Sequence, residues 1–217
     1  MNASATRGFA NREQAGRILA EKLAPLAVGR NPVLLALPRG GVPVAAVVAG
    51  RLGVPMDVLI VRKLGVPGHE EFAMGAIAGG GVMVLDHRVV AQLGLDLADV
   101  ERVIQRETRE LARREELYRE NRPPPAVAGR TVIVVDDGVA TGSTMSAAIE
   151  LLRHQKAARI IVAVPVAPPD TARRLRGEAD EVVTLLEPAD FMAVGRWYED
   201  FSQTSDEDVR RLLAGQG

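Results

Sequence analysis

The sequence predicts an α/β fold: a mostly parallel, twisted sheet flanked by helices, with a long mobile loop and a small C-terminal appendage. Two observations carry this prediction. Short apolar runs bounded by turn residues recur along the chain, as expected of buried strands, and helical patterns alternate with them. The chain has 217 residues, 47% of them hydrophobic and 25% charged, and can therefore bury the core of one domain. In such sheets ligands bind at the carboxyl ends of the strands.

The first half of the chain begins with alternating helices and strands. An amphipathic helix over 11–27 starts at Asn11, which can cap it. The next elements are predicted as a strand over 33–37, a helix over 42–52 and a strand over 57–61. Seven of the twenty residues from 62 to 81 are glycine or proline, which favours a long loop or a β-arm. Fourteen charged residues among the twenty-five from 96 to 120, with a narrow apolar stripe, predict a long helix.

The second half continues the alternation and then departs from it. The predicted elements are a strand over 131–135, a helix over 143–155, a strand over 159–164, a helix over 170–176 and a strand over 181–185. The tail holds four of the seven aromatic residues and ends in a helix over 205–214, which Ser205 can cap. We therefore divide the chain into a core domain, 1–186, which includes the loop 62–81 and the long helix 96–120, and an appendage, 187–217.

Composition excludes several classes of function. Lysine and arginine number 27 against 28 aspartate and glutamate, so the chain lacks the basic excess typical of proteins that bind nucleic acid or anionic membranes. The absence of cysteine excludes disulfides, thiolate zinc sites and a cysteine nucleophile. The longest apolar stretch, 72–85, is too short and glycine-rich to span a bilayer, and residues 1–8 contain no apolar signal segment. We expect a cytoplasmic protein.

The stretch 132–144 is the most informative part of the chain. Four apolar β-branched residues end in two adjacent carboxylates, Asp136 and Asp137, which small and hydroxyl residues follow at the start of a helix. Because side chains alternate along a strand, the two carboxylates point to different sides and suit the binding of a diol better than a facing acid–base pair. Backbone N–H groups and hydroxyls over Thr141–Thr144 suit a phosphate monoester.

This stretch resembles the phosphoribosyl pyrophosphate motif of the type I phosphoribosyltransferases, although a capped strand-turn-helix of another α/β protein remains the alternative. The resemblance implies that Asp136 and Asp137 contact the ribose hydroxyls and that either carboxylate touches Mg²⁺, the expected cofactor, through water. It also implies a 5-phosphate site, formed by Ala140, Thr141, Gly142, Ser143 and Thr144.

A second stretch, 35–43, resembles the pyrophosphate loop of the same family. The resemblance implies that Arg39 clamps the leaving pyrophosphate and that a cis peptide bond is common in this loop. Gly40 and Gly41 allow unusual backbone angles and a close approach of N–H groups to an anion. Lys63 resembles the family's basic residue beside the pyrophosphate. A glycine turn with a surface arginine is the alternative for the loop.

The segment 65–81 corresponds in position to the family's mobile loop. It contains His69, Glu70 and Glu71, although a loop histidine is more often solvent-exposed than catalytic. The stretches 62–77 and 193–201 also resemble a group of uncharacterised bacterial phosphoribosyltransferase-like proteins, so the resemblance covers nearly the whole chain.

The resemblance implies an enzyme that transfers ribosyl phosphate from phosphoribosyl pyrophosphate to a nitrogenous base and releases pyrophosphate. Ala140 stands where the hypoxanthine-guanine branch has an aspartate, which argues against ordinary 6-oxopurine salvage. The appendage would form a hood over the acceptor, with Phe191, Trp197 or Tyr198 stacking on it, although aromatic clusters more often fill a core. Family members commonly form homodimers. A regulator that senses phosphoribosyl pyrophosphate without transfer, and a hydrolase of an activated sugar phosphate, are the alternatives.

Overall fold

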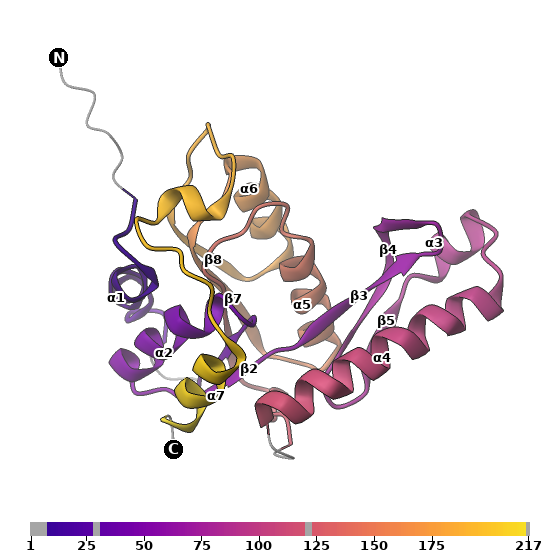
Figure 1. The fold of residues 1–217 in the computed structure, drawn as a ribbon, viewed down its shortest axis with the longest axis horizontal. Coiled ribbons are helices and arrows are strands. Elements are labelled where there is room, and N and C mark those ends of the chain that lie inside the picture. The colour runs from indigo at the N-terminus through magenta and orange to yellow at the C-terminus, as the bar shows by residue number, and fades with distance from the viewer. Residues whose placement is uncertain (1–7, 28–30, 120–122, 216–217) are drawn as a thin grey trace.

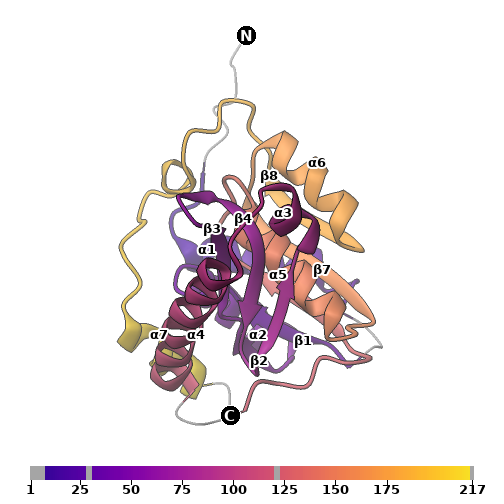
Figure 2. The ribbon, with the colours of Figure 1, turned by 90° about the vertical axis from the view of Figure 1, so that its right-hand side faces the viewer.

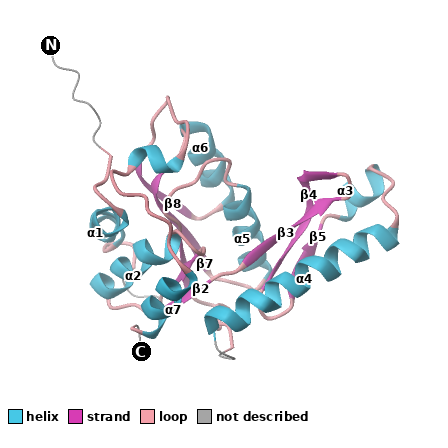
Figure 3. Ribbon diagram, in the orientation of Figure 1, coloured by secondary structure: helices cyan, strands magenta, loops and turns pink. Residues whose placement is uncertain are grey.

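The computed structural model describes residues 8–27, 31–119 and 123–215. Within them a five-stranded parallel sheet, the main sheet, has the strand order β2, β1, β6, β7, β8 (Figure 1, Figure 3). Its strands are β1 (Val33–Ala36), β2 (Met56–Val58), β6 (Thr131–Val135), β7 (Arg159–Val166) and β8 (Glu181–Leu186). The predicted fold class is confirmed. The predicted helix end at residue 120 and the terminal residues 1–7 and 216–217 lie outside the described residues.

Helices cover both faces of the main sheet, as Figure 1 shows. One face packs against α1 (Arg12–Leu23) and α2 (Gly41–Leu52), and the other against α5 (Ser143–His154) and α6 (Pro169–Glu178). Because side chains alternate along a strand, Ile133 of β6 joins the hydrophobic cluster on the first face and Val134 the cluster on the second. Every residue of β1 and β6 is buried, which explains why uninterrupted apolar runs predicted these strands.

The segment predicted as a long loop or a β-arm is an arm. Residues 61–85 form a separate antiparallel sheet of β3 (Val61–Val66), β4 (His69–Ala78) and β5 (Val82–Leu85), and this sheet replaces the mobile loop of the prediction. The glycines of this segment support the arm instead of interrupting it. Gly68 takes a positive φ in a turn, and a Cβ on Gly75 would lie 2.2 Å from the carbonyl oxygen of Val84 in β5.

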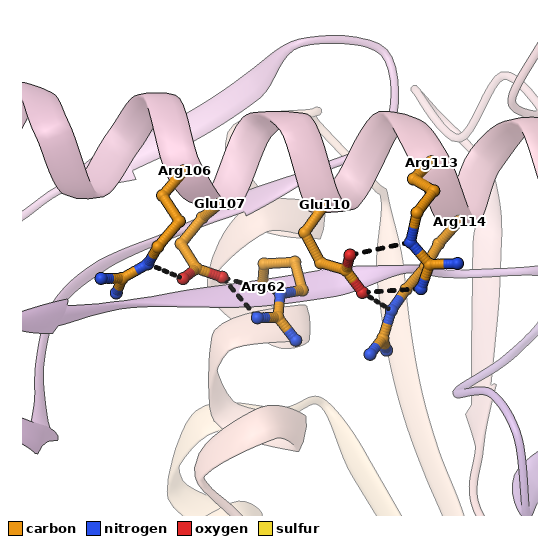
Figure 4. Close-up of polar contacts among 6 residues, drawn as sticks. All are labelled: Arg62, Arg106, Glu107, Glu110, Arg113 and Arg114. Carbon is orange, nitrogen blue, oxygen red and sulfur yellow. Dashed lines mark hydrogen bonds and ion pairs between the residues drawn. The ribbon is translucent and has the colours of Figure 1, made fainter.

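The long helix α4 (Leu97–Arg119) lies along the arm and joins it to the core (Figure 1). Arg62 of β3 donates two hydrogen bonds to Glu107 of α4, at 2.8 and 2.5 Å (Figure 4). At the other end of α4, the buried Arg119 donates to the carbonyl of Val58 at 2.5 Å. The prediction of this helix is confirmed, whereas β5 and the short α3 (His87–Gln92) were not predicted.

The C-terminal segment, 187–215, leaves β8 and passes over the core to α7 (Asp206–Ala214) after a short 3₁₀ helix, η1 (Val194–Trp197) (Figure 1). Figure 2 shows α7 beside α4, and α7 also packs on α2. Ser205 caps α7 as predicted, since its hydroxyl accepts the N–H of Asp208 at 3.0 Å. Among the helices of the described residues, none combines the length and apolar character that a membrane crossing requires.

Candidate active site

The pairing of β1 with β6 brings the two sequence motifs together at one edge of the main sheet. The strands are parallel and adjacent, so the turn after β1 and the carboxylates after β6 emerge side by side. A Cβ on Gly40 would lie 2.1 Å from Oδ2 of Asp137, and one on Gly41 would lie 2.9 Å from the Cα of Asp136. A side chain at Gly41 would strike backbone, and one at Gly40 would displace the Asp137 carboxylate or the turn. The turn contains a cis peptide bond between Pro38 and Arg39.

The prediction of unusual backbone angles in this turn is wrong for Gly40. Its φ of −60° and ψ of −33° are ordinary helical values. The predicted approach of N–H groups to an anion stays a prediction; within the described structure the space beside Gly40 is taken by the carboxylate of Asp137, and that beside Gly41 by the backbone of Val135 and Asp136.

The two carboxylates of the pair, Asp136 and Asp137, lie in different surroundings. The backbone N–H of Asp137 donates to Oδ1 of Asp136 at 2.8 Å. Burial raises the pKa of Asp136 well above its ordinary value, and the neighbouring charge of Asp137 raises it further. Burial also raises the pKa of Asp137, against the opposing effect of Arg12. A charged pair in this position is costly unless cations or hydrogen-bond donors compensate it.

Arg12 supplies part of that compensation, although the sequence did not single it out. Its Nε and Nη2 both lie 2.8 Å from Oδ2 of Asp137, across the site from the first turn of α1. The buried Tyr198 donates its hydroxyl to the backbone carbonyl of Asp137 at 2.5 Å. Asp137 is therefore held by two elements, α1 and the C-terminal segment, that lie far apart in the sequence.

The residues from Ala140 to Thr144, here called the hydroxyl loop, line a cavity of about 130 Å³ at the start of α5. Gly142 is the N-cap of α5, with a left-handed φ of 74°, and no side chain caps the helix. The N–H groups of Ser143, Thr144 and Met145 belong to the first turn, which has no intrahelical partners for them. Such free N–H groups at a helix N-terminus favour an anion.

Side chains add further donors to the hydroxyl loop. The hydroxyls of Thr141 and Ser143 lie 3.3 Å apart, and Lys63 of β3 donates to Ser143 at 3.3 Å. On the outer side, Arg174 of α6 donates to the carbonyl of Thr141 at 2.5 Å, and Thr171 donates to that of Ala140 at 2.8 Å. These contacts bind the loop's carbonyls to α6. Neither α6 residue was predicted, because nothing in the sequence distinguishes them from other polar helix residues.

The two predicted cations occupy different parts of the site. Lys63, at the root of the arm, contacts the hydroxyl loop. The exposed Arg39 lies 3.7 Å from Asp206, the first residue of α7, and Asp206 also accepts the hydroxyl of Tyr118 at 2.5 Å. Burial and this hydrogen bond raise the pKa of Tyr118 to about 12. His69 is exposed near the β3–β4 turn.

The three aromatic residues predicted to contact an acceptor have different surroundings. Tyr198 is 7% exposed and packs against the buried Phe9 and the exposed Phe201, with ring centroids 5.4 and 5.2 Å away, so its ring already has two aromatic partners. Phe191 and Trp197 are half-buried. The buried indole nitrogen of Trp197 has no hydrogen-bond partner among the described residues. The C-terminal segment does reach the site, since a Cβ on Gly138 would lie 2.5 Å from a methyl group of Val194.

Comparisons with known proteins show which family the chain belongs to and agree with its fold. A crystal structure of TT1426 from Thermus thermophilus is 47% identical in sequence and has a TM-score of 0.89, covering 96% of this chain and 99% of that one. Two Mycobacterium tuberculosis proteins, provisionally named phosphoribosyl transferases MT0597 and Rv0571c, are each 49% identical over 205 residues. The match covers 94% of this chain but 46% of those relatives, so the chain spans about half their length. The family model of the phosphoribosyl transferase domain matches residues 68–197, and the chain belongs to that family.

Proposed function

We propose that the protein transfers ribosyl phosphate from phosphoribosyl pyrophosphate, with Mg²⁺, to a nitrogen atom of a base and releases pyrophosphate. The observation that carries this proposal is the placement of a carboxylate pair, the half-buried Asp136 and the buried Asp137, directly before an uncapped helix N-terminus lined with hydroxyls. Carboxylates accept hydrogen bonds from a diol, and free N–H groups donate them to a phosphate. A pentose 5-phosphate carries a diol on its ring and a phosphate at its other end.

In this proposal the hydroxyl loop binds the 5-phosphate through its free N–H groups and through Thr141, Ser143 and Thr144. Lys63 adds a positive charge at Ser143. The carboxylate pair accepts the ribose hydroxyls. With both ends fixed, the orientation of C1 toward its nucleophile can contribute roughly 7–11 kcal/mol to lowering the barrier.

Arg39 is proposed to stabilise the leaving group. As the base nitrogen forms its bond to C1, the bond from C1 to the pyrophosphate oxygen breaks and its electron pair stays on that oxygen. A guanidinium at the developing charge stabilises this step. Arg39 lies beside the Asp206 carboxylate, so binding pyrophosphate would require it to leave that ion pair.

Within the described part of the chain, the site offers Mg²⁺ carboxylate oxygens but not a complete set of protein ligands. Among the described residues no cluster of three or more histidine or acidic side chains could hold a metal ion by itself. Burial and the neighbouring Asp137 both disfavour the charged form of Asp136. A cation would therefore stabilise the Asp136 side chain most directly. Mg²⁺ prefers oxygen ligands and commonly takes several of them from substrate phosphates and water. When bound, it would neutralise charge on the pyrophosphate.

The acceptor is proposed to lie under the C-terminal segment, beside Phe191 or Trp197. Their half-buried rings offer a planar apolar surface. Ala140 provides no carboxylate for a purine proton. A homodimer and a cytoplasmic location belong to the same proposal and rest on the resemblance and the composition alone.

Two measurements test the transferase. Pyrophosphate release from phosphoribosyl pyrophosphate and Mg²⁺ should require a base, to be found by screening purines, pyrimidines and other planar heterocycles. Calorimetry should detect binding of the same donor to the wild type. No detectable binding of the donor would refute the proposal.

The variant Asp137→Asn tests the assigned diol contact. We expect donor affinity to fall about tenfold or more, because a charged acceptor becomes a neutral one, with unchanged circular dichroism. Asp170→Asn, at an exposed acid on α6 that pairs with Arg173, is the control and should bind as the wild type does. Equal affinity of the Asp137 variant and the wild type would remove Asp137 from the site.

A non-catalytic sensor of phosphoribosyl pyrophosphate is the second candidate, and the arm favours it. A loop that closes over the reacting atoms is expected of the transferase, whereas here 61–85 is a folded sheet fastened to α4 by Arg62 and Glu107. Tight donor binding without pyrophosphate release, across the whole panel of bases, would establish the sensor.

A further inference from the structure

Arg12 is the one cation that directly contacts the carboxylate pair in the described residues, and neither motif contains it. It lies in the first turn of α1, after the N-cap Asn11, and Asp137 lies 125 residues further along the chain. Within the described residues its side chain is 11% exposed and that of Asp137 12%. Removing one partner of two nearly buried, oppositely charged groups costs more than removing one partner of a surface ion pair, because the remaining buried charge is left uncompensated.

The geometry of Arg12 is fixed on three sides. Nε donates to one oxygen of Asp137, Oδ2, and Nη2 forms an ion pair with the same oxygen at 2.8 Å, so the pair does not use Oδ1. Nη1 donates to the backbone carbonyl of Ser202 at 2.8 Å. The guanidinium carbon lies 4.0 Å from the centroid of the Phe201 ring, within the range of a cation–π contact. The side chain therefore has little freedom to follow Asp137 if that carboxylate moves.

We propose that Arg12 is a positioning residue that fixes the carboxylate of Asp137 for the sugar hydroxyls and connects it to the C-terminal segment. The inference rests on the proposed function, because it assumes that Asp137 binds a ribose. Arg12 holds Oδ2 in place, and a hydroxyl of the sugar binds the oriented carboxylate. The C-terminal segment thereby helps to build the donor half of the site, in addition to any role over the acceptor.

The test measures hydroxyl recognition separately from phosphate recognition. Calorimetry is run with ribose 5-phosphate, its 2-deoxy and 3-deoxy analogues, and inorganic phosphate, on the wild type and on Arg12→Met. In the wild type at least one deoxy analogue should bind more weakly than ribose 5-phosphate. In Arg12→Met that difference should shrink to less than twofold, with ribose 5-phosphate weakened about tenfold or more and inorganic phosphate unchanged. A merely structural role would not change the hydroxyl difference selectively.

Two further variants complete the design. Arg17→Met removes a cation from the same helix whose partner is the exposed Glu13, and it should behave as the wild type does. Arg12→Lys keeps the charge but cannot donate through a planar fork, so the hydroxyl difference should be partly restored. If Arg12→Met does not fold, Arg12→Lys decides alone: a reduced difference supports the inference and an unchanged one overturns it.

The outcomes distinguish this inference from the proposed function. A wild type that binds phosphoribosyl pyrophosphate while Arg12→Met keeps the full hydroxyl difference overturns the role of Arg12 only. A wild type that binds neither the donor nor ribose 5-phosphate overturns both. In an Asp137→Asn background, Arg12→Met should cause no further loss of hydroxyl recognition, because the two residues act on the same contact.

Discussion

At the scale of single residues, the site depends on how closely a backbone can approach a carboxylate. Gly40→Ala places a methyl group 2.1 Å from Oδ2 of Asp137, so either the turn or the carboxylate must shift. We expect a loss of about 1–3 kcal/mol in the free energy of unfolding and at least tenfold weaker donor binding. Gly50→Ala is the control, in the helix α2 that Gly40 caps; a Cβ there meets nothing within 4 Å, and the variant should stabilise the protein by up to about 1 kcal/mol. Urea denaturation and calorimetry measure both effects, and unaltered donor binding in Gly40→Ala would contradict the tight turn.

Asp206 restrains Arg39 only weakly. The two side chains are 40% and 44% exposed and lie 3.7 Å apart, so the ion pair contributes less than about 1 kcal/mol. Asp206→Asn should therefore strengthen pyrophosphate binding by no more than about fivefold, and the gain should diminish as salt is raised. Titration of pyrophosphate at low and high salt measures this. Weaker binding in Asp206→Asn would mean that Asp206 orients Arg39 for the ligand instead of competing for it.

The sequence allowed the carboxylate pair to be found, but not its partner. Asp136 and Asp137 end an apolar run, and that position is visible without a structure. Arg12 and Arg17 lie on the same amphipathic helix with nothing local to separate them, yet Arg12 contacts Asp137 and Arg17 contacts Glu13. Only the packing of α1 beside the C-terminal segment decides between the two. The spacing of apolar residues along a helix does not reveal contacts with residues this distant in the sequence.

At the scale of elements, the sequence left the segment 62–81 open between a long loop and a β-arm. In the sequence, the glycines of 62–81 look like interruptions of a strand. Strand pairing nevertheless requires some of them, since a Cβ on Gly75 would strike the backbone of β5. The apolar stripe of α4 was predicted, but its packing against the arm was not. When a helix and a sheet stabilise one another, neither segment's own sequence shows that the two are in contact. The predicted β-arm alternative was the correct description.

The arm's attachment to α4 makes a prediction at this scale. Glu107 is 6% exposed, and Arg62→Met leaves it with Arg106 as its remaining partner in Figure 4. Burying a less compensated carboxylate should cost about 1.5–3 kcal/mol in urea denaturation. Arg113→Met is the control, because that side chain is 63% exposed and pairs with Glu110, and it should cost less than about 0.5 kcal/mol. Equal costs would show that the Arg62–Glu107 contact does not hold the arm.

At the scale of the whole molecule, the parallel sheet was predictable and its strand order was not. The apolar composition of each buried strand makes it recognisable in the sequence. The order β2, β1, β6, β7, β8 is set by pairing between strands far apart in the chain, which composition does not reveal. The hydrophobic cluster on the α1–α2 face also includes Leu64 and Met74 of the arm and Val209 and Leu213 of α7. The arm and the C-terminal segment therefore share a core with the main sheet.

That shared core predicts how the molecule unfolds. The division of the chain at residue 187 stays a prediction, and we propose that the appendage nevertheless unfolds together with the core as one cooperative unit. Trp197, the single tryptophan, reports on the C-terminal segment, while far-ultraviolet circular dichroism reports on the main sheet and its helices. Both signals should give the same midpoint in urea. In Leu213→Ala, a cavity opens beneath α7, and both midpoints should fall together by an amount equivalent to about 2–4 kcal/mol. A tryptophan transition that precedes the loss of circular dichroism would show that the appendage unfolds alone, with the donor site losing Tyr198 and Ser202 before the sheet melts.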